Sequence, residues 1–278
     1  MKIFKFAISI VALLAFSFAG APSAHAGTVI LEGSDAIGYH CAIGDVGACA
    51  YRDQVWSAVA GPSTLSIAVF GNTVNGSAVA GSATHAVADF STVAAAGALN
   101  QYSALYFLAN DGCCDENDSL ITASGAQSAV AAYLAAGGTV MIENYIGGAA
   151  WDFAVGAGGQ GHANTGGWDG GLPPSNGGDG ETVTATGLAN GFTQPPVMSF
   201  WEHQGYNEAF FASLGFTLSF YDADPVFAEN NPTLGPFSGL LSNGQTKTGE
   251  AGAPEPASFA LFGLGLLAMG VVRRARRV

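Results

Sequence analysis

Residues 122–143, TASGAQSAVAAYLAAGGTVMIE, contain the signals for a helix, a turn and a buried strand in immediate succession. Thr122 or Ser124 is placed to cap a helix that continues to Ala136, and the pair Gly137-Gly138 ends it. Residues 139–142 then form an apolar run without alternation, which is typical of a strand covered on both faces. A helix followed by a buried strand is the unit from which parallel sheets are built.

The same pattern recurs on both sides of this stretch. Further strands are predicted at 28–31, 65–70, 104–109 and 216–220, and helices at 51–60, 90–99 and 207–214. The sequence therefore predicts an α/β three-layer sandwich with a mainly parallel sheet, flavodoxin-like or Rossmann-like. A largely β sandwich is the alternative, because Gly, Ser and Thr are abundant.

A glycine-rich segment at residues 156–180 interrupts this alternation. Eleven of its 25 residues are Gly, which predicts a long surface loop. His162 and Trp168 are unusual in a passive linker, so a ligand-binding lid is the alternative interpretation.

The N-terminus has the three parts of a secretory signal peptide. Lys2 and Lys5 precede an apolar run at 6–18, and Ala24 and Ala26 satisfy the small-residue rule for cleavage before Gly27. We therefore expect residues 1–26 to be removed by signal peptidase. The alternative is a membrane anchor that stays on the protein, although the run is shorter than the roughly 20 residues that a span needs.

The C-terminus, residues 253–278, carries a second membrane signal. Pro254-Glu255-Pro256 precedes an uncharged stretch at 257–272, and four arginines follow it: Arg273, Arg274, Arg276 and Arg277. As a helix, 257–272 would cover about 24 Å at about 1.5 Å per residue, slightly less than a bilayer core of about 30 Å. We expect a transmembrane helix with its basic end in the cytoplasm.

This tail resembles the PEP-CTERM sorting signal, which has the same three parts in the same order. The resemblance implies recognition and removal of the tail by an exosortase in the inner membrane of a Gram-negative bacterium. It also implies a mature protein at the cell surface or in the extracellular matrix, in contact with exopolysaccharide or other cell-surface components. An ordinary C-terminal membrane anchor is the alternative.

The exported part, residues 27–252, is strongly acidic. Six of the eight Lys and Arg residues lie in the two ends, whereas 20 of the 21 acidic residues lie between them, so the net charge of this part is near −18. Such a charge repels nucleic acid and anionic lipid, and it favours cations, cationic surfaces or simply solubility. Its length is sufficient for one large domain or two small ones.

Four cysteines, Cys41, Cys49, Cys113 and Cys114, are expected to form disulfides in an oxidising compartment. The simplest arrangement links one or both of Cys113 and Cys114 to the 41–49 segment. Cys41–Cys49 with a bond between the neighbours Cys113 and Cys114 is the other arrangement.

An acidic cluster follows the strand predicted at 104–109. Closely spaced carboxylates suit Ca²⁺, although the spacing does not match an EF-hand loop. The candidate ligands are Asp111, Asp115, Glu116 and Asp118, and a solvated acidic turn is the alternative.

Carboxylates and histidines also follow several predicted strands. In open α/β sheets, ligands bind outside the carboxyl ends of the strands. Carboxylates beside imidazoles in one crevice can form a general base or a metal site. The candidates are Asp35, His40, Asp111, Glu143 and His203.

Common catalytic motifs are absent, including G-x-S-x-G, H-E-x-x-H, the P-loop and C-x-x-C. The middle of the chain resembles the class I glutamine amidotransferase-like superfamily in its order of elements and in residues 137–143. That family's nucleophile lies in a G-x-C-x-G turn, whereas residues 111–115 here read DGCCD and lack the second glycine.

Three functions follow from these patterns. The first is a surface or matrix protein whose α/β domain binds or scaffolds without turnover. The second is an exported hydrolase-like enzyme that uses the carboxylates and histidines at the carboxyl edge. The third is a calcium-dependent adhesion module centred on residues 111–118.

Overall fold

The computed structural model describes seven stretches of the chain: residues 27–71, 78–109, 117–146, 148–164, 181–194, 203–223 and 235–247. The expected signal peptide at 1–26 and the tail at 253–278, with its predicted membrane helix at 257–272, lie outside these stretches. So does most of the glycine-rich segment, residues 165–180. Within the described stretches, no helix has the length and apolar character needed to cross a membrane.

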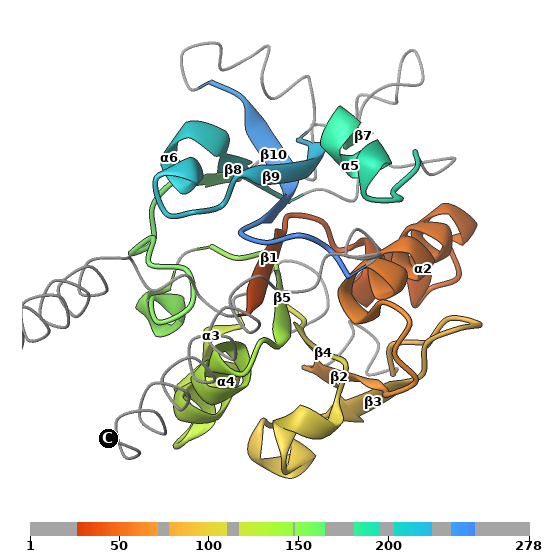
Figure 1. Cartoon of the computed structure of the whole chain (residues 1–278), viewed down its shortest axis with the longest axis vertical. Helices are drawn as coiled ribbons and strands as arrows, with labels where there is room; N and C mark the ends of the chain where they lie inside the picture. Colours follow the sequence, from red (N-terminus) through yellow and green to blue (C-terminus); the bar gives the residue numbers. More distant parts are fainter. Residues whose placement is uncertain are drawn as a thin grey trace, which may run out of the picture.

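Five parallel strands form one half of the sheet (Figure 1). Their spatial order is β3-β2-β4-β5-β1, and each strand pairs with its neighbours in parallel. The strands are β1 (Thr28–Glu32), β2 (Ile67–Phe70), β3 (Val87–Phe90), β4 (Ala104–Phe107) and β5 (Thr139–Glu143).

An antiparallel half continues the sheet beyond β1. β10 pairs antiparallel with β1 and also with β8 and β9. β6 then pairs antiparallel with β8, and β7 pairs antiparallel with β9. These strands are β6 (His162–Asn164), β7 (Thr182–Val183), β8 (Gln204–Asn207), β9 (Leu218–Asp222) and β10 (Phe237–Ser242).

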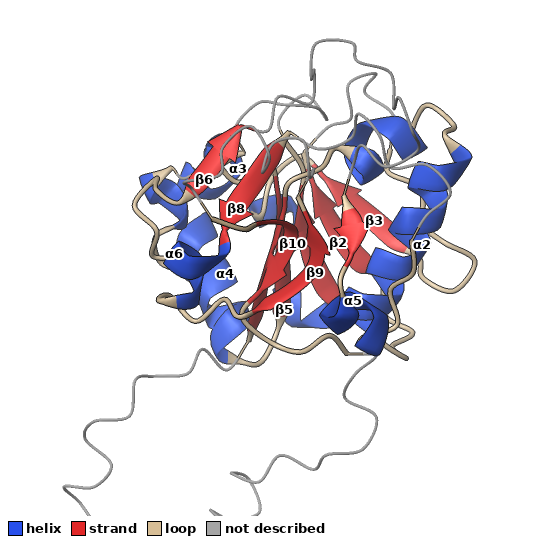
Figure 2. Ribbon diagram, turned by 90° about the horizontal axis from the view of Figure 1, so that it is seen from above, coloured by secondary structure: helices blue, strands red, loops and turns tan. Residues whose placement is uncertain are grey.

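Helices cover both faces of the parallel half, with α2 on one side and α4 on the other (Figures 1 and 2). The α-helices are α2 (Val46–Ala60), α3 (Asp118–Thr122), α4 (Ala126–Ala135), α5 (Ala185–Ala189) and α6 (Glu208–Ala212). Shorter turns are the π-helix η1 (Ala36–Cys41) and the 3-10 turns η2 (Ala94–Ala96), η3 (Leu99–Gln101) and η4 (Ala149–Trp151).

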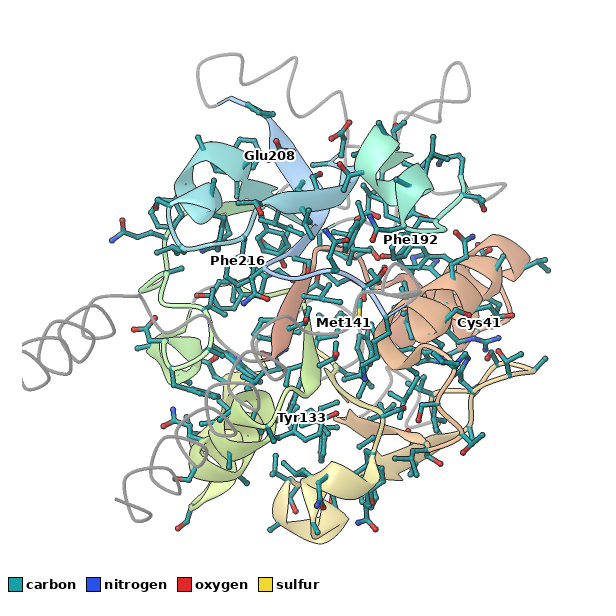
Figure 3. The ribbon with its side chains drawn as sticks, in the orientation of Figure 1. Cys41, Tyr133, Met141, Phe192, Glu208 and Phe216 are labelled. Atoms are coloured by element: carbon teal, nitrogen blue, oxygen red, sulfur yellow. A yellow bond between two sulfur atoms is a disulfide. The ribbon has the colours of Figure 1, made fainter. Side chains whose placement is uncertain are left out.

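Two hydrophobic cores result from the alternation of side chains along each strand. On β1, Val29 and Leu31 join the core beneath α4, whereas Ile30 joins the core beneath α2. Met141 of β5 also belongs to the α2 core and lies near the centre of the molecule, between the helical layers (Figure 3). Every residue of β1 after Thr28 and all of β2, β4 and β5 are buried, as the unalternating runs predict.

The α/β class and the parallel strands agree with the sequence prediction, and the two helical layers contradict the alternative of a largely β sandwich. The strand order departs from the flavodoxin-like and Rossmann-like orders, since β1 lies beside β5 rather than beside β2. The antiparallel half is a further addition, although the strand predicted at 216–220 overlaps β9 within it.

Two local predictions are wrong. The helix expected at 90–99 is the end of β3 followed by η2 and η3, because β3 completes the edge of the sheet by pairing with β2. Neither Thr122 nor Ser124 caps α4, which instead begins after Gly125, a glycine with φ of 81°. The turn after α4 does contain Gly137 in the left-handed region, with φ of 89°.

Candidate functional site

Two glutamates face each other at the carboxyl ends of neighbouring parallel strands. Glu32 ends β1 and Glu143 ends β5, and the register of the two strands makes them direct partners. Both side chains are completely buried. Their positions in the pleat match Ile30 and Met141, so both point into the layer beneath α2.

Tyr106 of β4 bridges the two carboxyl groups. Its hydroxyl lies 3.0 Å from Glu32 Oε2 and in closer contact with Glu143 Oε2. Because a tyrosine hydroxyl has one hydrogen to donate, the second contact needs a proton on a carboxyl group. Ser34 Oγ also donates to Glu32, at 3.0 Å from Oε1.

Burial determines the protonation of this pair. Desolvation raises the pKa of Glu32 from 4.5 to about 8, against the hydrogen bonds that lower it, and nearby Asp35 raises it further. Desolvation also raises the pKa of Glu143 well above its ordinary value, and repulsion from Glu32 adds to the rise. At neutral pH the pair therefore retains protons, in agreement with the hydrogen bonding of Tyr106.

Gly38 of η1 closes this network from above. A Cβ atom at this position would lie 2.8 Å from Glu143 Oε1 and 2.9 Å from Leu108 Cδ2, so no larger residue fits. This close approach of the backbone to the carboxyl groups explains why position 38 is a glycine.

Asp35 lies between two histidines just beyond the end of β1. His40 Nε2 is 3.3 Å from its Oδ1, and His203 Nε2 is 3.1 Å from its Oδ2. The Asp35 side chain is 1% exposed, whereas those of His40 and His203 are 19% and 10% exposed. A buried carboxylate thus lies between two imidazoles, of which His40 is partly exposed and His203 is nearly buried.

Backbone contacts bring the distant His203 to this position. The amides of His203 and Gln204 both donate to the carbonyl of Gly33, at 2.7 and 2.9 Å. A Cβ on Gly33 would lie 1.8 Å from the carbonyl oxygen of Gln204, so only glycine permits this approach. The start of β8 is therefore fastened to the loop that carries Asp35.

The segment that carries His40 is a π-helix stapled to α2. A disulfide joins Cys41, the last residue of η1, to Cys49 in α2. Arg52 of α2 donates from Nη1 to Cys41 Sγ at 3.2 Å. Short π-helical segments are frequent at functional sites, where they redirect side chains.

This disulfide overturns the simplest arrangement predicted from the sequence, in which Cys113 or Cys114 pairs with the 41–49 segment. Cys41 and Cys49 are close because η1 turns back onto the first turn of α2, with Cα atoms 4.6 Å apart. Cys113 and Cys114 lie outside the described residues.

Asn144 adds an unusual backbone to the same edge. It follows Glu143 with φ of 49°, a left-handed conformation that few residues other than glycine adopt. Its amide donates to the carbonyl of Glu32 at 2.6 Å. Such conformations gather at functional sites because the surrounding structure must hold them.

Asn117 fixes the other side of the β5 end. Its Nδ2 donates to the carbonyl of Glu143 at 2.9 Å, and its Oδ1 accepts from Trp151 Nε1 at 2.9 Å. The side chain is 2% exposed, so this amide connects β5 to η4 from within the fold.

The predicted site residues divide into two groups. Asp35, His40 and His203 lie together, and Glu143 lies beneath them with Asp35 close enough to raise its pKa. Asp111, Asp115 and Glu116 are outside the described residues, and Asp118 begins α3 with its carboxylate against the backbone of Gly148. Among the described residues, no three His, Cys, Asp or Glu side chains are arranged to hold a metal ion.

Glu32 and Tyr106 are functional candidates that sequence reasoning missed. Glu32 had a usable signal: like Glu143, it directly follows a run of buried strand residues. Tyr106 had no such signal in the sequence. An aromatic residue inside an apolar strand cannot be told from a core residue until the register of the neighbouring strands is known.

Chemically, the arrangement offers oriented imidazoles above a protonated carboxyl pair. An imidazole positioned by a carboxylate can accept a proton from a bound molecule or donate a hydrogen bond to it. The carboxyl pair beneath it is inaccessible to solvent and serves to fix the ends of β1, β4 and β5.

Comparison with known protein families identifies one feature of the chain. Residues 253–277 match the PEP-CTERM protein-sorting motif. This motif implies an exported protein that is anchored in the membrane, processed by an exosortase and then located at the cell surface. No curated protein and no solved structure showed significant similarity, so the resemblance to glutamine amidotransferases has no support from them.

Proposed function

We propose that the α/β domain is a surface-displayed binding module that acts without turnover. Its binding site is the carboxyl edge of the parallel strands, around Asp35, His40 and His203. The observation that carries this proposal is the convergence of two imidazoles, the partly exposed His40 and the nearly buried His203, on one buried carboxylate, at distances of 3.3 and 3.1 Å.

The position of this cluster supports a ligand site. Open α/β sheets bind their ligands outside the carboxyl ends of the strands, which is where Asp35 lies. The buried carboxyl pair and the Cys41–Cys49 disulfide hold the segment in place, so little ordering is needed when a ligand binds.

The sorting motif and the negative net charge of the domain indicate which class of ligand it binds. A protein delivered to the cell surface meets exopolysaccharide and other envelope components. A net charge near −18 between the two ends disfavours acidic polymers, whereas the hydroxyl groups of a neutral polysaccharide can hydrogen-bond to imidazoles without that repulsion. We therefore favour a neutral polysaccharide.

Retention of the exported, tail-less protein on immobilised polysaccharides tests this proposal. Dextran and cellulose serve as neutral probes and alginate as an acidic one. We expect retention on a neutral probe and about a tenfold loss in His40→Ala/His203→Ala, since a lost network of hydrogen bonds costs roughly 1.5 kcal/mol or more.

His162→Ala is the matched control, because His162 is a partly exposed histidine on β6 that pairs with Gln204 instead of Asp35. It should be retained like the wild type. Failure of the wild-type protein to bind any neutral probe, with its fold intact, would show that this ligand class is wrong.

A hydrolase-like activity is the second candidate, and two observations favour it. Asp35 orients the imidazoles as the carboxylate of a general-base pair would, and Asn144 holds a rare backbone conformation at the same edge. Release of nitrophenol from nitrophenyl glycosides and esters tests it. Turnover that disappears in His203→Ala but persists in His162→Ala would replace binding by catalysis as the function.

A further inference from the structure

The described chain begins and ends at the same edge of the sheet. β1 starts at the amino edge of the parallel half with Thr28, whose amide donates to the carbonyl of Gly138. β10 runs antiparallel to β1 and returns to this edge, where Ser242 pairs with Ile30. The candidate binding site lies at the other end of these strands.

Residues 243–247, which we call the strap, then run along the amino edge and are bonded to neighbouring elements at Asn243, Thr246 and Lys247. Asn243 is joined to Val29 in both directions: its Oδ1 accepts from the Val29 amide at 2.7 Å, and its own amide donates to the Val29 carbonyl at 3.2 Å. Further along, Thr246 Oγ1 donates to Asn190 Oδ1 at 3.1 Å, and the Thr246 side chain is buried.

Lys247 fastens the end of the strap to two more elements. Its amide donates to the carbonyl of Ala58 at the end of α2, at 2.8 Å. Its ammonium group donates to the carbonyl of Ser103, which directly precedes β4. A Cβ on Gly61 would lie 2.6 Å from Lys247 Cβ, so the end of α2 is shaped to receive this side chain.

The strap ends very close to the sorting motif in the sequence. Only residues 248–252 separate Lys247 from the motif at 253–277. Even fully extended, these residues reach about 17 Å at roughly 3.4 Å each. The tail therefore leaves the folded domain from a bonded position, with little chain to spare.

We propose that the strap determines the distance and orientation at which the exosortase meets this protein. The amino edge of the sheet faces the membrane and the processing enzyme while the tail is inserted. The carboxyl edge, at the far end of strands about 16 Å long, faces away from the membrane. The proposal does not depend on what the carboxyl edge binds.

The test follows processing of the full chain in cells that produce an exosortase, with the tail-less fraction measured by intact mass. Deletion of residues 248–252 should lower this fraction at least tenfold, because the folded domain then collides with the enzyme. Releasing the strap by Thr246→Ala with Lys247→Pro, which removes the Lys247 amide donor and ammonium, should restore processing of the deletion variant.

One control separates length from sequence. Replacement of residues 248–252 by the spacer Ser-Gly-Ser-Gly-Ser keeps the length and should be processed like the wild type. The protease resistance of the domain, measured in each variant, confirms that it has folded.

Three outcomes would overturn the proposal. The deletion variant could be processed like the wild type, which would mean that the domain imposes no limit on reach. The spacer could restore processing while release of the strap does not, which would mean that the tail is not held to the domain at Thr246 and Lys247. The Ser-Gly replacement could fail, which would make residues 248–252 a recognition sequence instead of a spacer.

Discussion

The two ends of the same strands are built in different ways. At the carboxyl edge, β1 and β5 end in buried glutamates, and the chain continues into a π-helix and a left-handed asparagine. At the amino edge, the strands begin with tight glycine contacts and are joined by the hydrogen bonds of the strap. We propose that the carboxyl edge carries the binding site and that the amino edge carries the attachment of the tail, while both edges contribute to stability.

Protonation of the buried glutamates at the carboxyl edge should have the largest effect on the stability of the fold. Since burial raises the pKa of Glu32 from 4.5 to about 8, the folded state holds a proton that the unfolded state releases as pH rises. The stability from this group is complete below about pH 4.5 and is lost as pH rises through about 8. The full difference is on the order of 5 kcal/mol.

We therefore expect the free energy of unfolding to fall between about pH 5 and pH 8, measured by urea denaturation. Glu32→Gln/Glu143→Gln, in which neither buried side chain can lose a proton, should flatten most of this fall. Glu208→Gln is the control: its pKa is also raised by burial, but it lies on α6 outside the network and should change the profile less. A profile that stays steep in this double variant would contradict the assignment of the retained protons to this pair.

Removing the bridging hydroxyl should have the next largest effect. Tyr106→Phe leaves two buried carboxyl groups without their shared partner, which costs about 1–3 kcal/mol. Because the hydrogen bond from Tyr106 lowers the pKa of Glu32, its loss should also move the pH-dependent fall to higher pH. Tyr102→Phe is the control, since that hydroxyl donates to the carbonyl of Ala96 at 3.2 Å, away from the acids.

The parallel half could be predicted from the sequence because each of its buried strands has a physical signature. β1, β2, β4 and β5 are short apolar runs, and their number and class follow from burial on both faces. In the antiparallel half, the strand predicted at 216–220 overlaps β9, whereas β6 and β8 have no such signature. β8 reads QGYN and β6 reads HAN, and these residues become strands only because β10 and each other offer backbone partners.

Part of the candidate site could also be predicted from the sequence, because it depends on where the strands end. Ligands bind at the carboxyl ends of parallel strands, so the strand assignments alone predict that Asp35, His40 and Glu143 lie at one candidate site. Glu32 and Tyr106 require the register between strands, because their side chains meet only when Glu32 pairs with Glu143. Register is a tertiary property that a single strand does not encode.

The disulfide offers a smaller and more local test at the carboxyl edge. Cys41→Ser/Cys49→Ser removes a link across a sequence separation of 8, which is worth roughly 2.5 kcal/mol in the loop-entropy account. It also frees the π-helix that positions His40, so polysaccharide retention should weaken. Wild-type protein kept in reductant should unfold at the same urea concentration as the variant. Retention that is unchanged in the variant would show that His40 is held without the disulfide.

The smallest expected effect concerns the amino edge. Thr246→Val keeps the shape of a buried side chain but removes its hydrogen bond to Asn190, which should cost about 1 kcal/mol. No group with a raised pKa takes part in this contact, so the variant should lower the free energy of unfolding equally at every pH. Its curve should run parallel to that of the wild type, whereas the curve of Tyr106→Phe should change shape. A change of shape in Thr246→Val would mean that the strap and the carboxyl network are coupled through β1, and that the two edges do not act independently.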